Sequence, residues 1–289
     1  AALADDYDLK AHDIGLKLAP GANVHLLPNI AGFVGADHVS FVLAAGIHDT
    51  DKVTIGLDIG TNTEISLAAN GRLLCCSTAS GPAFEGAHIQ DGMRAAAGAI
   101  EWIQPDGGNV EYQTIDDAPP VGICGSGILD GVAALRKLGV VRPNGAMKAN
   151  GNPRVRRTER GVEFVLVPAG ERSAPQDVVI TRKDINEIQL AKAAMRAGVE
   201  ILLQEAGLKD DDIEQFIIAG AFGTYLDVDS AVAIGMFPDL PRARFTQVGN
   251  AAGTGARLSL LSHSCRDQAR EIAQRTEYVE LTTYPDFTE

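Results

Sequence analysis

One short run of the sequence combines a carboxylate, glycines and hydroxyl residues in an order that suits phosphate chemistry. Residues 53–64 read VTIGLDIGTNTE, so that Asp58 stands near the end of an apolar strand, two residues before a Gly-Thr turn. N–H groups and hydroxyls in such a turn can bind phosphate oxygens, and the carboxylate can face a metal ion or a water. Residues 65–68 (ISLA) predict a second strand, so the turn closes a hairpin. A hairpin that merely contains these residues is the alternative.

Two further glycine-containing segments follow predicted strands. Residues 80–86 read SGPAFEG after a strand at 72–77, and residues 220–223 read GAFG after a strand at 216–219. Glycine allows the backbone to approach a phosphate or a purine closely, because no Cβ stands between them. Each segment alone could be an ordinary turn, but three such loops at strand ends favour a nucleotide cleft at one edge of a sheet.

The composition is that of an ordinary globular protein. The 289 residues could form one large domain or two lobes, and 45% of them are hydrophobic. No apolar stretch reaches membrane-spanning length and no signal-peptide pattern is present, so we expect a cytoplasmic protein without membrane contact. The net charge of −13 argues against nucleic acid as a partner. The chain begins without Met, which fits a processed or excised piece.

The cysteines and histidines suggest no metal centre. The spacing of Cys75, Cys76, Cys124 and Cys265 fits neither a disulfide framework nor a zinc or iron–sulfur site. We therefore expect reduced thiols. The six histidines are scattered, and none has a second ligand at metal spacing.

Hairpins that alternate with helices predict an α/β fold, a mixed sheet of the ribonuclease-H type with flanking helices. Thr181 and Asp184 predict a capped helix that lasts until Gly207. A spacing of three and four between Ile89, Met93, Ala97, Ile100 and Ile103 predicts another long helix. Shorter helices are expected from Asp37 to Gly46, after the run at 122–127 as far as Leu138, and at 251–261. Further strands are expected at 23–27, at 245–250 and at 278–281, and one more begins at residue 121.

Two segments have open interpretations. Residues 142–178 are polar and broken, which predicts a surface hairpin around 162–167; its arginines at 154, 156 and 157 could face a partner or solvent. The run Gly125-Ser126-Gly127 could be an anion loop or, more simply, a helix entry capped by Ser126. Cys124 beside it suits a small buried residue better than a nucleophile.

Four segments together resemble the actin-like superfamily of heat-shock chaperone ATPases and sugar and acetate kinases. Residues 30–37 with the following helix are similar to the first connecting helix, and residues 58–66 to the second phosphate motif. Residues 217–223 are similar to the adenosine motif, and residues 249–256 to the second connecting helix.

A narrower resemblance is to the C-terminal ATPase region of the reductive activators of corrinoid proteins. It extends from about residue 23 to the C-terminus, so residues 1–22 are a lead-in and residues 23–289 the ATPase region, with 142–178 inserted. The matching strings are at 27–37, 79–86, 92–95, 122–127, 189–194 and 249–252.

This resemblance implies a longer protein with a ferredoxin domain and a middle domain upstream. Such proteins use ATP to reduce a Co(II) corrinoid protein to Co(I), with electrons from a 2Fe-2S cluster. The sequence has no four-cysteine ferredoxin segment and only one Asp-x-Gly-Thr turn, so the cluster and the first phosphate motif would lie outside it. The implied cofactors are ATP and Mg²⁺. The implied partners are the corrinoid protein, the upstream domains and a possible second copy.

The resemblance also assigns roles to residues. Asp58 would take the Mg²⁺ or attacking-water position, and Glu64 would be a second carboxylate or a brace within the sheet. The expected contacts to nucleotide are Gly60, Thr61, Asn62 and Thr63 for the phosphates, Gly81 and Glu85 for the loop facing the ribose, and Gly220, Ala221 and Gly223 for adenine and ribose. A docking or dimerisation module without catalysis and a small-molecule kinase remain the alternatives.

Overall fold

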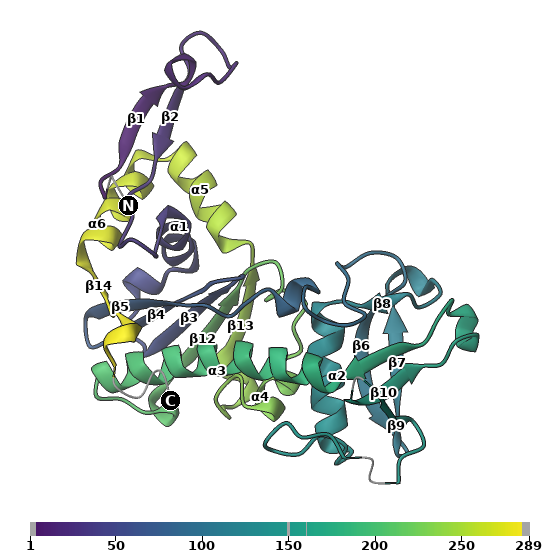
Figure 1. The fold of residues 1–289 in the computed structure, drawn as a ribbon. Coiled ribbons are helices and arrows are strands. Elements are labelled where there is room, and N and C mark those ends of the chain that lie inside the picture. Colours follow the sequence, from purple (N-terminus) through teal and green to yellow (C-terminus); the bar gives the residue numbers. More distant parts are fainter. Residues whose placement is uncertain (1–3, 149–150, 160, 285–289) are drawn as a thin grey trace.

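A six-stranded mixed sheet forms the centre of the molecule (Figure 1). The structure is a computed structural model, and it describes residues 4–148, 151–159 and 161–284. The strand order is β13-β12-β3-β4-β5-β14; β4 is antiparallel to both of its neighbours, β3 and β5, while β12 runs parallel to β3. The strands are β3 (Thr54–Ile59), β4 (Thr63–Ala69), β5 (Arg72–Thr78), β12 (Gln215–Ala219), β13 (Phe245–Gly249) and β14 (Thr276–Tyr278).

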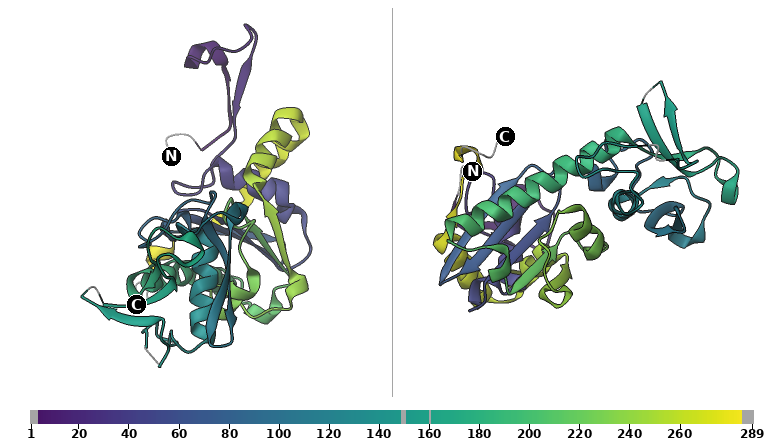
Figure 2. Two further views of the ribbon diagram at one scale, coloured as in Figure 1. Left: turned by 90° about the vertical axis from the view of Figure 1, so that its right-hand side faces the viewer. Right: turned by 90° about the horizontal axis from the view of Figure 1, so that it is seen from below.

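Helices cover both faces of this sheet (Figures 1 and 2). One face carries α1 (Ala36–Ala45), α5 (Ala251–Leu261) and α6 (His263–Arg275). Helices α1 and α5 approach closely at Gly255, where a Cβ would lie 2.0 Å from the carbonyl oxygen of Ser40. The small residues in the first turns of the helix predicted at 251–261 therefore serve helix packing. The sequence had given no sign of α6.

The long helix α3 (Arg182–Glu205) packs on the opposite face and begins as predicted. Thr181 and Asp184 form a reciprocal capping box, in which the Thr181 side chain accepts from the Asp184 N–H. One face of the helix is apolar and buried: Ile188, Ala191, Met195, Val199 and Leu202 all lie in the main core. Sequence periodicity identified this helix because local capping and long-range packing agree.

Replacing Thr181 with alanine is expected to lower the free energy of unfolding by about 1 kcal/mol, because the N-terminal N–H groups of α3 lose their acceptor. Urea denaturation followed by far-UV circular dichroism measures this. Asn186→Ala, an exposed change one turn further into the same helix, is the control and should cost nothing. An equal effect of the two substitutions would contradict the capping role.

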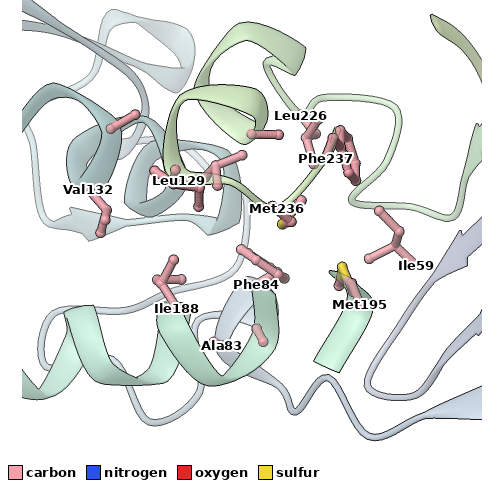
Figure 3. Packing of buried hydrophobic residues seen from close by; sticks show 14 of the residues in the cluster. Ile59, Ala83, Phe84, Leu129, Val132, Ile188, Met195, Leu226, Met236 and Phe237 are labelled. Atoms are coloured by element: carbon pink, nitrogen blue, oxygen red, sulfur yellow. The ribbon is translucent and has the colours of Figure 1, made fainter. Parts of the chain in front are cut away.

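A second unit lies at the other end of α3 (Figures 1 and 2). It contains two three-stranded sheets, in the orders β7-β6-β8 and β11-β10-β9. Their core is continuous with that of the main sheet, and Figure 3 shows side chains from α2, α3 and the loops meeting between them. The elements are β6 (Ala99–Asp106), β7 (Asn109–Thr114), β8 (Gly122–Ile123), α2 (Gly125–Lys137), β9 (Val155–Thr158), β10 (Gly161–Val167) and β11 (Val178–Thr181), and α4 (Val228–Ile234) lies between α2 and the main sheet.

The predicted helix through Ile89 and Ile103 was wrong. Turns occupy this segment up to Gly98, which has φ +82°, and β6 follows. Ile100 and Ile103 are both buried because β6 changes register between Ile100 and Trp102. This β-bulge adds one residue, so a spacing of three places both side chains on one face of a strand and imitates a helix.

Other expectations needed smaller corrections. The hairpin at 162–167 exists as β9 and β10, but its inner side chains Phe164 and Val167 are fully buried in the core, so it is not a surface element. Two of its arginines pair with carboxylates, Arg154 with Glu171 and Arg156 with Glu163. The C-terminal strand ends earlier than expected, at Tyr278.

An N-terminal hairpin, β1 (Tyr7–Lys10) with β2 (Asn23–Leu26), projects away from the rest of the chain (Figures 1 and 2). An ion pair of 2.9 Å between Asp6 and Arg270 ties its base to α6. None of the helices in the described ranges is long and apolar enough to cross a membrane.

Candidate functional site

The loops that follow β3, β5 and β12 meet at one edge of the six-stranded sheet. The N–H of Gly81 donates to the carbonyl oxygen of Thr61 over 2.9 Å, and the hydroxyl of Thr61 donates to the Glu85 carboxylate over 2.5 Å. These two hydrogen bonds join the loop at 58–64 to the loop at 80–86. The sequence prediction that the glycine loops converge is therefore confirmed for this pair.

Glycine is required where the third loop leaves β12. Gly220 has φ +95°, and a Cβ there would lie 2.3 Å from the carbonyl oxygen of Ile59, the residue after Asp58. Its N–H donates to the carbonyl oxygen of Gly249. A Cβ on Gly223 would similarly lie 2.3 Å from the carbonyl oxygen of Ala219. The glycines thus let this loop lie directly against the end of β3.

Asp58 and Glu64 lie directly opposite each other on β3 and β4, so both half-buried side chains point to the same face of the sheet. Burial raises the pKa of Asp58 to about 6, and the negative charge of Asp37 adds to the shift. Burial also raises the pKa of Glu64 to about 7, with repulsion from Asp37 and Asp58 opposing the hydrogen bond that Glu64 accepts from Ser77. Three carboxylates therefore act on one another here.

Both roles considered for Glu64 are compatible with its position. The Ser77 hydroxyl donates to its carboxylate over 3.1 Å, which braces it against β5, while Asp58 remains its direct neighbour.

The phosphate role expected for Thr63 needs correction. Thr63 is fully buried, and its hydroxyl accepts a 2.6 Å hydrogen bond from Ser80. Its side chain stabilises the base of the loop from inside.

The tip of the loop is open to a ligand. Gly60, Thr61 and Asn62 are exposed, and none of the described residues accepts a hydrogen bond from their backbone N–H groups. Free N–H groups in a tight turn form a concave site for anions. A phosphate group at this tip would also find the Thr61 hydroxyl, provided that the hydroxyl leaves Glu85.

Beside the loops lies a cavity of about 580 Å³, here called the aromatic cavity. Phe84 and Phe222 stack in its wall, with ring centroids 4.2 Å apart and 11° between the planes. Because Glu85 and Ala221 also line it, the cavity adjoins the loops at 80–86 and 220–223, and the Thr61–Glu85 hydrogen bond links it to the loop at 58–64, here called the phosphate loop. The lining residues are Phe84, Glu85, Met93, Arg94, Ala95, Glu101, Ile115, Cys124, Gly125, Ser126, Ala221, Phe222 and Tyr225.

The entry of α2 forms another part of this wall, and here the expected cap was wrong. The N-cap residue is Cys124, no side chain caps the helix, and the Ser126 hydroxyl lies 3.4 Å from the Cys124 sulfur. Ser126 already stands inside the first turn. The N-terminal N–H groups of α2 are therefore left without a side-chain acceptor beside the cavity.

Sequence reasoning missed three parts of the site. Asp37 was treated only as a helix start, although its charge reaches Asp58 and Glu64. The Phe84–Phe222 pair and Glu101 were not singled out at all. Asp37 could have been suspected from its place in the string resembling a connecting helix. The aromatic pair is a contact between residues far apart in the sequence and left no local pattern.

The donor set suits a hard cation such as Mg²⁺. Within the described ranges, no three His, Cys, Asp or Glu side chains come close enough to form a complete metal site. Mg²⁺ commonly binds through one or two carboxylates together with waters and substrate phosphates. Asp58 and Glu64, half-buried and mutually repelling, provide such a partial set.

Comparison with known proteins agrees with this geometry. Residues 52–289 match a family profile described as the C-terminal domain of RACo, the ASKHA domain, and residues 1–50 match the RACo middle region. A solved reductive activator for corrinoid, iron-sulfur protein superimposes with a TM-score of 0.90 at 39% identity, covering 99% of this chain and 46% of that one.

Two curated relatives have related names. The corrinoid activation enzyme RamQ of Eubacterium limosum is 38% identical over 295 residues, which is 99% of this chain and 49% of the relative. A [Co(II) methylated amine-specific corrinoid protein] reductase of Methanosarcina barkeri is 28% identical over 283 residues, 90% of this chain and 48% of the relative.

The fold and the loop arrangement define a nucleotide-binding domain of the actin-like ATPase class. The chain belongs to the RACo family of reductive activators of corrinoid proteins. It spans about half the length of the curated relatives it matches. The two family matches meet at residues 50–52, whereas the sequence alone suggested a division at 22/23.

Proposed function

We propose that this chain is the ATP-binding C-terminal region of an activator that reduces a Co(II) corrinoid protein to the Co(I) form. The observation that carries the proposal is the junction of the phosphate loop, the loop at 80–86 and the aromatic cavity at one sheet edge. Family membership supports the same reading. The electron would come from a 2Fe-2S cluster in an upstream domain, and ATP hydrolysis would supply the free energy.

Each part of the site has a distinct task in this proposal. The free N–H groups at 60–62 and the Thr61 hydroxyl hold the β- and γ-phosphates, and Glu85, once released by Thr61, accepts from the ribose hydroxyls. The nucleoside occupies the aromatic cavity beside Gly220 and Ala221. Asp58, with Glu64, would hold Mg²⁺, which neutralises phosphate charge when bound. The first phosphate loop would come from another part of the middle region, which residues 1–50 match.

Isothermal titration of the chain with ATP and Mg²⁺ tests the nucleotide site. Measurable binding is expected, and Thr61→Ala should weaken it about tenfold, because one hydroxyl contact to an anionic oxygen is lost. Thr282→Ala, an exposed threonine near the C-terminus, is the matched control and should bind ATP as the wild type does. Absence of binding by the wild-type chain would favour a docking module instead.

A further inference from the structure

The β-bulge in β6 places a carboxylate in the wall of the aromatic cavity. Strands β6 and β7 change register between Ile100 and Trp102, so Glu101 is an extra residue without a partner in the ladder. Bulges of this kind redirect a side chain, and they are frequent beside binding sites. Glu101 lines the cavity together with the stacked pair Phe84 and Phe222. The bulge therefore explains why the carboxylate of Glu101 lies in the cavity wall.

Glu101 needs a hydrogen-bond donor that the described part of the chain does not provide. It is half-buried, yet none of the described residues donates a hydrogen bond to it or forms an ion pair with it. A carboxylate that loses part of its hydration without a partner is costly. Glu85, the other carboxylate in the lining, is exposed, accepts from Thr61 in the free chain and is assigned to the ribose in the proposed complex. Glu101 is thus the carboxylate of the lining that is left for the base.

We propose that Glu101 is the residue that selects the base, its carboxylate accepting a hydrogen bond from the 6-amino group of adenine. This inference rests on the nucleotide binding proposed above. The stacked rings of Phe84 and Phe222 and a volume of about 580 Å³ suit a purine nucleoside. An ionised carboxylate only accepts hydrogen bonds, so it favours the amino group of adenine and opposes the keto oxygen at the same position of guanine.

Equilibrium dialysis of the chain with three triphosphates tests this inference. ATP has the 6-amino group, purine riboside 5′-triphosphate lacks it, and GTP has an oxygen there. Glu101→Ala should weaken ATP binding tenfold or more and leave binding of the purine riboside triphosphate unchanged. Glu101→Gln keeps one acceptor oxygen and should recover part of the ATP affinity. The matched control is Glu111→Ala on β7, an exposed carboxylate that does not line the cavity and should change nothing.

The outcomes separate the base-selecting role from a structural role. If Glu101→Ala weakened ATP and purine riboside triphosphate equally, the carboxylate would only support the cavity, and the inference would be overturned. Unchanged ATP affinity, or tighter binding of GTP than of ATP by the wild type, would overturn it as well. A wild-type chain that binds none of the three would instead remove the nucleotide function itself. Urea denaturation of each variant shows whether the fold is retained.

Discussion

Asp58→Asn should abolish Mg²⁺-dependent binding of ATP and at the same time stabilise the free protein at pH 8. The loss of binding follows from removal of the carboxylate that we propose holds Mg²⁺, and we expect at least a hundredfold weaker affinity, about 3 kcal/mol. The gain in stability follows from burial, because the charged form of Asp58 is disfavoured in the folded state.

The direction in which stability changes with pH follows from proton binding. The pKa of Asp58 rises from 3.8 in the unfolded chain to about 6 in the fold, so the folded state binds the proton more tightly. This contribution to stability is fully present below about pH 4 and is lost as the pH rises through about 6. Asparagine does not titrate and avoids the loss. We expect a gain of roughly 1–2 kcal/mol at pH 8.

Denaturation by urea at pH 4 and pH 8 in the presence of a chelator, together with ATP titration, measures both effects. The wild type and the variant should differ more at pH 8 than at pH 4. Asp51→Asn, an exposed carboxylate in the turn before β3, is the control for a change of charge alone. A variant that is less stable than the wild type at pH 8, or one that retains ATP affinity, would contradict the assignment.

Gly220→Ala should lower the free energy of unfolding by roughly 2–4 kcal/mol and disrupt the nucleotide site. Two costs add: the left-handed backbone at φ +95° disfavours alanine, and the new Cβ would lie 2.3 Å from the carbonyl oxygen of Ile59. Because Ile59 follows Asp58, the backbone shift that relieves this contact also moves the carboxylate and the phosphate loop. Guanidinium denaturation and ATP titration measure the two consequences.

The matched control separates the cost of the left-handed backbone conformation from the cost of the steric contact with Ile59. Gly71, in the turn between β4 and β5, also has a positive φ of +76°, but a Cβ there would meet nothing within 4 Å. Gly71→Ala should therefore cost only about 1 kcal/mol. Equal destabilisation by the two substitutions would show that the contact with Ile59 is unimportant.

The sequence predicted those features that are encoded over short distances. The hairpin around Asp58 was readable because two apolar strands flank a tight turn, and α3 was readable because Thr181 and Asp184 cap a regular stripe. The segment before Ile103 was misread because a bulge imitates helical spacing, and a bulge depends on the partner strand. The aromatic cavity escaped prediction for a similar reason, since the loops after β5 and β12, strand β6 and the start of α2 each contribute to it and only the packed fold brings them together.

Helix α3 belongs to both parts of the molecule, and this has a mechanical consequence. Its first turn is joined to the second unit, where Asp184 accepts a hydrogen bond from the N–H of Gln90, and its later turns pack on β4 and β5. With 24 residues it is about 36 Å long. Because a helix is stiff, a tilt of α3 by about 5° at the sheet would displace its far end by about 3 Å. A small tilt of α3 on the sheet would therefore also move the part of the second unit that it contacts.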